Sequence, residues 1–267
     1  MDLRHQAKKL LGKNRRASKL TQYKNAGQVK RLCDSIQEKY GLENIRNLKT
    51  KHIFGIFEEL KEKGLSPSSL ASYATAARTL AAALGKQNIV PRTNKELGIT
   101  RSGNRLRPVQ ADMAHSHAIT KQLYGKEEWL GLAAEMREQF GLRAKESLLS
   151  HETRDGELIV QGSKGGRPRT VKIRSECQRD ILERVQAHIE ANRKISLIPP
   201  DLSLKQGLKK QANLLHRLGA TKENASHAHS LRHHYAQQLI QAGLSKQEVS
   251  EELGHSREEI VAHYVPK

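Results

Sequence analysis

Short amphipathic segments, each followed by a glycine, place the strongest limit on how the first hundred residues can fold. In TKHIFGIFEELKEKG, Thr50 stands at an N-cap position, apolar residues recur at helical spacing, and Gly64 ends the pattern. In SPSSLASYATAARTLAAALG, Ser66 is the cap residue and Pro67 occupies the first helical position. Together with an apolar stripe in AGQVKRLCDSIQEKYG, these signals predict a compact all-α domain over residues 1–90.

The positive charge of the chain is concentrated in the same region. The 267 residues carry 47 Lys and Arg against 28 Asp and Glu, a formal net charge of +19. Residues 1–110 alone hold 23 of the basic and 8 of the acidic side chains, so the rest of the chain is nearly balanced. A surplus of this size predicts a polyanionic partner, and we expect nucleic acid. Charge alone does not distinguish DNA from RNA.

The pattern changes beyond the first domain. Residues 91–115 combine Pro, Gly, Asn and Ser with scattered arginines, and we interpret them as a basic interdomain linker. Residues 116–267 are predicted to form a second domain, with helices on both sides of Gly141. Within it, GELIVQGSKGGRPRTVKI places apolar residues on both sides of a Gly-rich basic turn and predicts an antiparallel β-hairpin. The expected fold class is mainly α, with a small antiparallel sheet in the C-terminal domain.

Helix boundaries are clearest near the end of the chain. A Ser-x-x-Glu capping box beginning at Ser245 opens one helix, Gly254 ends it, and a second box beginning at Ser256 opens another. This spacing predicts that His255 lies in a tight turn between two helices and that Tyr264 lies on the second of them.

Other features exclude several classes of protein. Cys33 and Cys177 are the only cysteines, and they form no metal-binding or disulfide pattern. No apolar run approaches the ~20 residues of a membrane span. The first twenty residues lack the apolar stretch of a secretory signal. We therefore expect a cytoplasmic protein without membrane attachment.

The histidines in the last forty residues raise the alternative of a metal site. His229 and His233 are four residues apart, a spacing that can chelate zinc on a helix, and His227 and His234 lie beside them. However, no carboxylate lies in the cluster, no HExxH pattern is present, and Arg232 would place a cation among the ligands. We favour the interpretation that these histidines lie on the surface or make hydrogen bonds, and we predict no bound metal.

Metal-free transfer of a phosphodiester has different requirements. Arginines bind the non-bridging oxygens of the transition state, a histidine donates a hydrogen bond or accepts a proton, a tyrosine attacks, and a lysine protonates the leaving oxygen. The closing segment offers His229, Arg232, His255 and Tyr264 for these tasks. Tyr235, in the same segment, is predicted to be a core aromatic residue and not a nucleophile.

The order of the motifs is similar to that of the tyrosine recombinase (phage integrase) family. GLRAKE resembles the motif of its first arginine, with Glu146 at the usual offset, and GSKGGRPRTVKI resembles its lysine hairpin. HSLRHHYA, LGH and a tyrosine nine residues after that histidine complete the series. The resemblance covers residues 116–267, and the basic helical domain is similar in style to the core-DNA-binding domain with which the family's catalytic domain clamps DNA. It implies six catalytic residues: Arg143, Lys164, His229, Arg232, His255 and Tyr264.

The resemblance implies a reaction that needs neither a metal nor a nucleotide cofactor. Tyr264 would attack a DNA phosphodiester, leaving a 3′-phosphotyrosine and a free 5′-hydroxyl. The two arginines, helped by His255, would hold the non-bridging oxygens. His229 would accept or share the tyrosine proton, and Lys164 would protonate the 5′ oxygen.

The resemblance also implies the partners. We expect double-stranded DNA at a recombination site, a homo-oligomer that forms a tetramer on paired sites, and in some reactions an accessory directionality factor. The chain would be a site-specific recombinase or integrase of a bacterium, phage or other mobile element, associated with the nucleoid. Family members often carry a further helix after the tyrosine that docks on a neighbouring subunit, whereas here Val265, Pro266 and Lys267 follow Tyr264.

Two alternatives stay open. A catalytically silent accessory protein could keep the same fold and bind DNA without cleaving it. A type IB topoisomerase-like enzyme could use similar chemistry to relax DNA without strand exchange.

Overall fold

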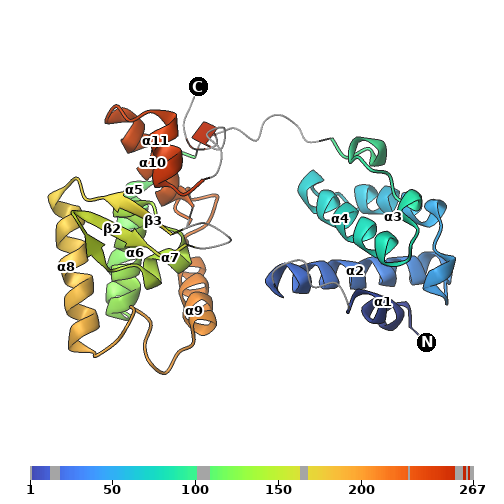
Figure 1. Cartoon of the computed structure of the whole chain (residues 1–267), viewed down its shortest axis with the longest axis horizontal. Coiled ribbons are helices and arrows are strands. Elements are labelled where there is room, and N and C mark those ends of the chain that lie inside the picture. The colour runs from blue at the N-terminus through green and yellow to red at the C-terminus, as the bar shows by residue number, and fades with distance from the viewer. Residues whose placement is uncertain are drawn as a thin grey trace. The chain divides into compact units, whose positions relative to one another are not determined.

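The computed structural model describes residues 2–12, 19–100, 109–162, 168–227, 229–255, 261–262 and 264. The chain divides into two compact units, residues 1–103 and 104–267, each with its own apolar core (Figure 1). No helix in these ranges is long and apolar enough to cross a bilayer. Cys33 is buried, Cys177 is exposed, and both are free thiols.

Helices packed around one core make up the first unit. In chain order its α-helices and 3-10 helices (η) are α1 (Leu3–Leu11), α2 (Lys19–Tyr40), η1 (Ile45–Asn47), α3 (Thr50–Glu62), α4 (Pro67–Ala83), η2 (Gln87–Ile89) and η3 (Lys95–Leu97). α2 packs against α1, α3 and α4. Leu32 of α2, Phe57 of α3 and Leu80 of α4 are buried in this core. The apolar stripes predicted from the sequence are therefore the faces that these helices bury.

The start of α4 is as predicted, but the start of α3 is not. Ser66 caps α4, because its hydroxyl accepts a hydrogen bond from the Ser69 amide at 3.3 Å. Thr50 is the first helical residue of α3, and Lys49 occupies the N-cap position. The Lys49 amide donates to Nδ1 of the buried His52 at 3.2 Å. The His52 imidazole thus takes the part that Glu or Gln plays in a capping box.

The predicted linker, residues 91–115, is too long at both ends. Leu97 and Ile99 are buried in the first core. These two residues are two positions apart, whereas the apolar residues of a helix recur every three or four positions. The sequence pattern therefore did not distinguish this segment from a linker. At the other end, Asp112 caps helix α5 (Met113–Tyr124) by accepting a backbone hydrogen bond.

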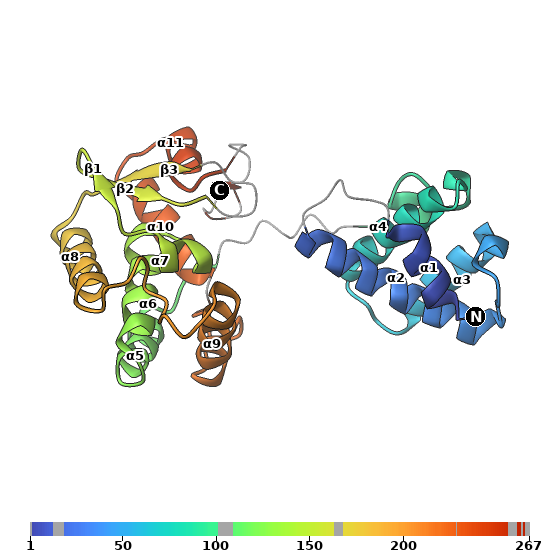
Figure 2. The same cartoon turned by 60° about the horizontal axis from the view of Figure 1, so that its bottom comes forward.

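In the second unit, helices surround a small antiparallel sheet. The helix α6 is central, because it packs against α5, α7, α8 and α10; Figure 2 shows it with α8 on one side and α9 on the other. The predicted fold class, mainly α with a small antiparallel sheet, is confirmed. The elements are α5, α6 (Glu128–Phe140), α7 (Ala144–Leu149), β1 (Thr153–Arg154), β2 (Glu157–Val160), β3 (Arg169–Lys172), α8 (Glu176–Ala191), α9 (Leu204–Arg217), α10 (Ser230–Gln241) and α11 (Lys246–Glu252).

The predicted hairpin forms two strands of a three-stranded sheet of order β1-β2-β3. β2 and β3 are antiparallel, and Leu158 lies opposite Val171 with both side chains buried. β1 extends the hairpin through a two-residue turn at Asp155 and Gly156, both with positive φ, the backbone conformation of a type I′ turn. β3 also packs against α11, which brings the sheet beside the turn that follows α11.

A left-handed glycine ends α6. Gly141 has a φ of 58°, and a Cβ atom there would lie 2.5 Å from the ring of Tyr235 on α10. The absence of a side chain lets α10 pack closely against the end of α6. The same backbone turn presents the Gly141 carbonyl to α10.

Gly141→Ala should destabilise the second unit more than Gly243→Ala. Both glycines have positive φ, so each alanine costs about 1 kcal/mol in backbone strain. Only at Gly141 does the new methyl group collide with a neighbour, since nothing lies within 4 Å at Gly243. We expect a further loss of about 1–3 kcal/mol in the free energy of unfolding. Trp129, the one tryptophan, is buried in the second core, so its fluorescence in a urea titration measures both losses. Equal losses would contradict the steric argument.

Candidate active site

A buried carboxylate organises the cluster of predicted catalytic residues. Glu146, on α7, is fully buried, and its Oε1 accepts a hydrogen bond from Nη1 of Arg143 at 2.7 Å. Its Oε2 accepts from Nη2 of Arg169, on β3, at 3.1 Å. Nη1 of Arg232, on α10, lies 4.0 Å from the same oxygen. One negative charge thus holds together three guanidinium groups that would otherwise repel one another.

The position of Glu146 in the helix explains its orientation. Arg143 is the N-cap residue of α7, and its backbone N–H donates to Oε2 of Glu146, three residues later, at 2.9 Å. This is the reciprocal half of a capping box. Burial alone would raise the pKa of Glu146, but hydrogen bonds and positive charge from Arg169 and Arg143 lower the pKa to about 2. The carboxylate is therefore ionised at neutral pH.

Arg232 is buried and holds the ends of two helices. Its Nη1 donates to the carbonyl of Gly141 at 2.6 Å, and its Nη2 donates to the carbonyl of Leu253. Gly141 and Leu253 are the C-cap residues of α6 and α11, whose last carbonyls lack helical donors. Burial and the charge of Arg143 lower the pKa of Arg232 to about 10, which leaves it cationic at neutral pH. Its Nε has no hydrogen-bond partner within the part of the chain that the structure describes.

His255 and Tyr264 lie against Arg232. Nε2 of His255 is 3.4 Å from Nη2 of Arg232, and the ring centroids of His255 and Tyr264 are 5.5 Å apart. The guanidinium carbon of Arg232 is 6.0 Å from the centre of the Tyr264 ring. A guanidinium can only donate, so we assign Nε2 of His255 as an acceptor and place its proton on Nδ1. Nδ1 then remains a donor.

Both histidines of the predicted set are neutral at neutral pH. Burial and the charges of Arg232 and Arg143 lower the pKa of His255 to about 4. His229 has an exposed side chain at the N-cap position of α10. Partial desolvation by its neighbours and the charges of Arg232 and His227 lower the pKa of His229 to about 4 as well. A neutral imidazole can accept a proton, which suits a general base.

A second set of residues, which the sequence motifs did not indicate, ties the sheet to the turn after α11. Nε of Arg169 donates to the carbonyl of Glu252 at 2.7 Å. The Glu252 carboxylate accepts two hydrogen bonds from Arg174, each 2.6 Å long, and one from the hydroxyl of Tyr235. Gly254 has a φ of 67°, and a Cβ atom there would lie 2.9 Å from Cδ of Arg169. This turn therefore requires a glycine both for its backbone conformation and for the close approach of the arginine.

Tyr235 is 3 % exposed, so the prediction of a core aromatic residue is confirmed. Burial and the neighbouring Glu252 raise its pKa, which further disfavours a phenolate there. His233, two residues before Tyr235, is half-buried, and its ring lies 4.6 Å from that of Tyr264. In the described ranges, no three or more His, Cys, Asp and Glu side chains form a group that could hold a metal ion.

The structure thus brings four predicted catalytic residues into one cluster, with His229 at the start of the helix that carries Arg232. Lys164 and the predicted capping box at Ser256 lie outside the described residues. The catalytic roles of all six residues stay predictions. The four clustered residues are Arg143, Arg232, His255 and Tyr264.

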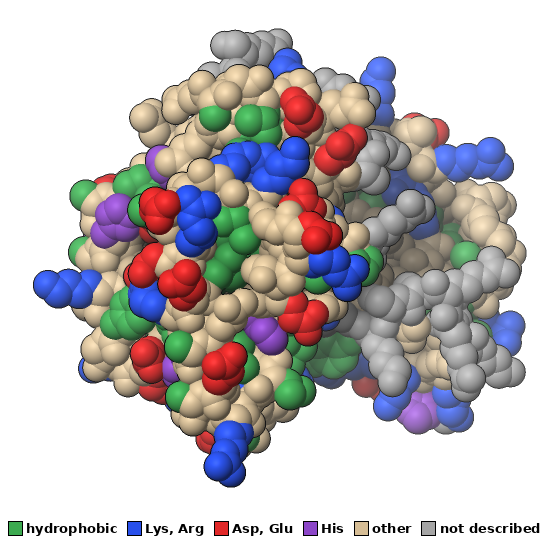
Figure 3. Space-filling model, turned by 60° about the vertical axis from the view of Figure 1, so that its left-hand side comes forward, with side chains coloured by type: hydrophobic (Ala, Val, Ile, Leu, Met, Phe, Trp, Pro, Cys, Tyr) green, Lys and Arg blue, Asp and Glu red, His purple; other side chains and the backbone are tan. Residues whose placement is uncertain are grey.

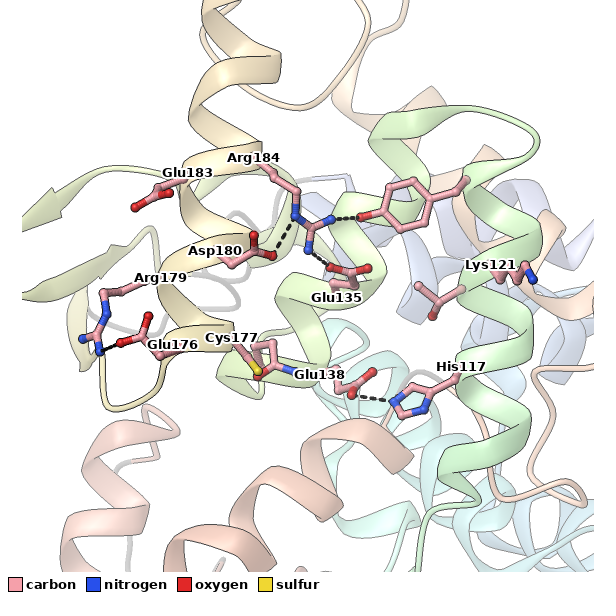
Figure 4. A pocket seen from close by; sticks show the side chains of 13 residues that line it. His117, Lys121, Glu135, Glu138, Glu176, Cys177, Arg179, Asp180, Glu183 and Arg184 are labelled. Carbon is pink, nitrogen blue, oxygen red and sulfur yellow. Dashed lines mark hydrogen bonds and ion pairs between the residues drawn. The ribbon is translucent and has the colours of Figure 1, made fainter.

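A groove of about 840 Å³ between α5, α6 and α8 is separate from this cluster, because none of the cluster's residues lines it (Figure 4). Arg184 crosses the groove and pairs with both Asp180 and Glu135. Arg179 pairs with Glu176. Acidic and basic side chains also alternate over the face of the second unit shown in Figure 3. Five acidic and three basic side chains line the groove, so it carries a net negative charge, unlike the cationic cluster around Arg232.

Sequence comparison then identifies the family. The sequence profile of the phage integrase family matches residues 127–267, and that of the phage integrase N-terminal SAM-like domain matches residues 8–88. The chain belongs to the phage integrase family. No curated protein matches its sequence.

Solved structures of recombinases share the fold of this family member. XerH site-specific recombinase, in a post-cleavage complex with a palindromic difH substrate, is 21% identical with a TM-score of 0.69, covering 98% of this chain and 80% of that chain. A lambda integrase dimer bound to a COC′ core site is 18% identical with a TM-score of 0.64, covering 97% and 93%. A lambda integrase tetramer bound to a Holliday junction is 17% identical with a TM-score of 0.62, covering 98% and 75%. The predicted resemblance to tyrosine recombinases is confirmed.

Glu146→Gln should destabilise the second unit at neutral pH by about 3–5 kcal/mol, because three arginines lose their shared counter-charge. The pKa of Glu146 is lowered on folding, so its contribution is complete above its usual pKa of 4.5 and is lost as the pH falls toward about 2. The difference in unfolding free energy between wild type and variant should therefore shrink over that interval. Urea titrations followed by Trp129 fluorescence at several pH values measure it.

Glu176→Gln is the matched control. Glu176 is 89% exposed and pairs with Arg179 one turn away, so its loss should change the free energy by about 0–1 kcal/mol. A Glu146→Gln protein as stable as wild type at pH 7 would show that the carboxylate does not hold the cluster together.

Proposed function

We propose that the chain is an active site-specific recombinase or integrase that cleaves and rejoins duplex DNA through a 3′-phosphotyrosyl bond to Tyr264. The observation that carries the proposal is the contact among Arg232, His255 and Tyr264, beside the charged Arg143. A protein that only binds DNA has no need of a tyrosine ring held close to a buried arginine. The similar structures of XerH and lambda integrase were determined with DNA, which supports DNA as the substrate.

In the proposed first step, the Tyr264 hydroxyl oxygen attacks the phosphorus of one DNA strand and the bond from phosphorus to the 5′ oxygen breaks. The phenolic proton passes to His229, whose neutral imidazole can accept it. Negative charge that develops on the non-bridging oxygens is held by Arg143 and Arg232. The family motif assigns Lys164 to protonate the departing 5′ oxygen.

Rejoining reverses these changes. A 5′-hydroxyl of the partner strand attacks the phosphotyrosine, the phenol leaves, and strand exchange results. One phosphate ester replaces another at each step, so the reaction requires no nucleotide hydrolysis. Because a lambda integrase tetramer was crystallised on a Holliday junction, we infer that four copies of this chain assemble on paired recombination sites.

The first unit would contribute much of the affinity for the DNA backbone. Lys24, Lys30 and Arg31 on α2 line a groove of about 890 Å³, together with residues of α1 and α4. Tyr23, beside them, is 79% exposed. Lysine and arginine side chains gathered on one face neutralise phosphates without reading sequence. We infer that this unit and the catalytic unit both contact the duplex, joined by the basic segment between them.

A nicked suicide duplex that carries the recombination site should trap a covalent adduct with the wild-type protein and none with Tyr264→Phe. Tyr124→Phe is the matched control: its hydroxyl accepts a hydrogen bond from Arg184 in the separate groove, so this variant should keep the adduct. Denaturing gels of labelled DNA measure the yield, and chelation by EDTA should leave the yield unchanged.

The outcomes separate the alternatives. An adduct formed by Tyr264→Phe would assign the nucleophile to another residue. No adduct from wild type would favour the silent accessory protein. An adduct with relaxation of supercoiled DNA but no strand exchange would favour the topoisomerase-like enzyme.

The double variant Lys24→Gln, Lys30→Gln should weaken DNA binding and make it less sensitive to salt. If each lysine neutralises one phosphate, the slope of log K against log salt should fall by about 1.8. Lys63→Gln removes a lysine that pairs with Glu59 on α3 and should leave the slope unchanged. Fluorescence anisotropy with a labelled duplex over a salt series measures the slopes, and equal slopes for all proteins would exclude this face from DNA contact.

A further inference from the structure

Two side chains of α10 hold the backbone of Val109, the first described residue of the second unit. Nε2 of Gln237 donates to the Val109 carbonyl at 3.3 Å, and Nδ1 of His233 accepts from the Val109 N–H at 3.4 Å. His233 and Gln237 are four residues apart in the helix, so they lie on one face of it. Both backbone groups of a single residue are therefore bound by neighbouring side chains of one helix.

The same two side chains contact Tyr264. Nε2 of Gln237 donates to the Tyr264 carbonyl at 2.9 Å. The ring centroids of His233 and Tyr264 are 4.6 Å apart. Tyr264 is 8% exposed, and neither it nor Val109 lies in a helix or strand. Side chains of α10 thus supply hydrogen bonds that regular secondary structure would otherwise provide.

The donors and acceptors of this contact match one another. The amide nitrogen of a glutamine has two N–H groups, and in Gln237 they serve two carbonyl acceptors, one in Val109 and one in Tyr264. His233 accepts at Nδ1, so we assign the proton of its neutral imidazole to Nε2. Among side chains of similar length, glutamate would place oxygen acceptors against the two carbonyls and methionine would offer no donor. The two carbonyls therefore favour an amide at position 237.

We propose that His233 and Gln237 are positioning residues for Tyr264, which fix it relative to Val109 and to Arg232 on the same helix. The inference rests on the proposed function, in which the Tyr264 hydroxyl attacks phosphorus. The attacking oxygen must lie at a defined place beside the phosphate that Arg232 binds, and an error of about 1 Å can cost about 100-fold in rate. Both positioning residues act through Tyr264 and take no part in proton transfer.

The connection to Val109 gives this arrangement a second consequence. Val109 follows the basic segment that joins the two units. A displacement of that segment at Val109 would act on both positioning side chains, and each of them contacts Tyr264. The position of the nucleophile would therefore depend on how the segment enters the second unit.

Nitration of the full chain by tetranitromethane, mapped by mass spectrometry, measures how firmly Tyr264 is held and does not depend on DNA cleavage. Tyr23, 79% exposed, is the reactive reference, and Tyr235, 3% exposed, reports an intact core. We expect Tyr264 to react about tenfold faster in Gln237→Met, because two hydrogen bonds are lost, while Tyr235 stays protected. Gln238→Met changes the exposed neighbour on α10 and should leave the rate as in wild type.

His233→Phe tests the connection to Val109. A phenyl ring keeps an aromatic neighbour for Tyr264 but cannot accept the hydrogen bond from the Val109 N–H. Hydrogen exchange should become faster in peptides that contain Val109, and nitration of Tyr264 should become faster with it. Faster exchange with unchanged nitration would show that Tyr264 is held independently of the segment.

Single-turnover cleavage of the nicked suicide duplex separates positioning from DNA binding. At saturating DNA, Gln237→Met should form the adduct about 10- to 100-fold more slowly than wild type, with an unchanged Kd for the duplex. Gln238→Met should match wild type. An equal or faster rate in Gln237→Met, or equal nitration of Tyr264 in Gln237→Met and wild type, would overturn the proposal. If wild type forms no adduct, the proposed function fails instead, and nitration still decides whether the two side chains hold Tyr264.

Discussion

The arrangement of the second unit depends on the interaction between the carboxylate of Glu146 and the guanidinium groups around it. Arg143 caps α7, Arg169 lies on β3 and Arg232 lies on α10, so a single anion joins a helix start, a sheet and a second helix. A phosphate-binding centre needs positive charges close together before the phosphate arrives, and such charges repel in its absence. For the proposed binding of phosphate, the carboxylate of Glu146 would compensate the arginines before the phosphate arrives.

Much of the fold follows from local signals. Helix starts at Ser66 and Ser245 and the helix end at Gly254 depend on a few neighbouring residues, so the sequence pattern predicts them. The cap of α3 could not be predicted in this way, since it uses the imidazole of His52, which seldom serves as a cap. The strand β1 was within reach of prediction, because Asp155-Gly156 is a two-residue hairpin turn, but the strand itself is only two residues long.

The residues of the candidate site also fall into those that the sequence predicted and one that it did not. Motif order predicted Arg143, Arg232, His255 and Tyr264, and the structure brings them together. Arg169 was missed because its partner, the carbonyl of Glu252, is 83 residues away, and no local pattern encodes a backbone acceptor at that distance. The strand alternation that it shares with the buried Val171 was the available signal for an inward-facing arginine.

Arg232 has two roles, one proposed in catalysis and one in stabilising the fold, and this affects how a protein of this family can lose its activity. The guanidinium proposed to bind phosphate also closes the ends of α6 and α11 through the carbonyls of Gly141 and Leu253. Erosion of the reaction by substitution of Arg232 would therefore weaken the fold at once, whereas loss of the Tyr264 hydroxyl leaves both helix ends intact. A descendant that gave up catalysis but kept its architecture would be expected to change its tyrosine first and its arginine last.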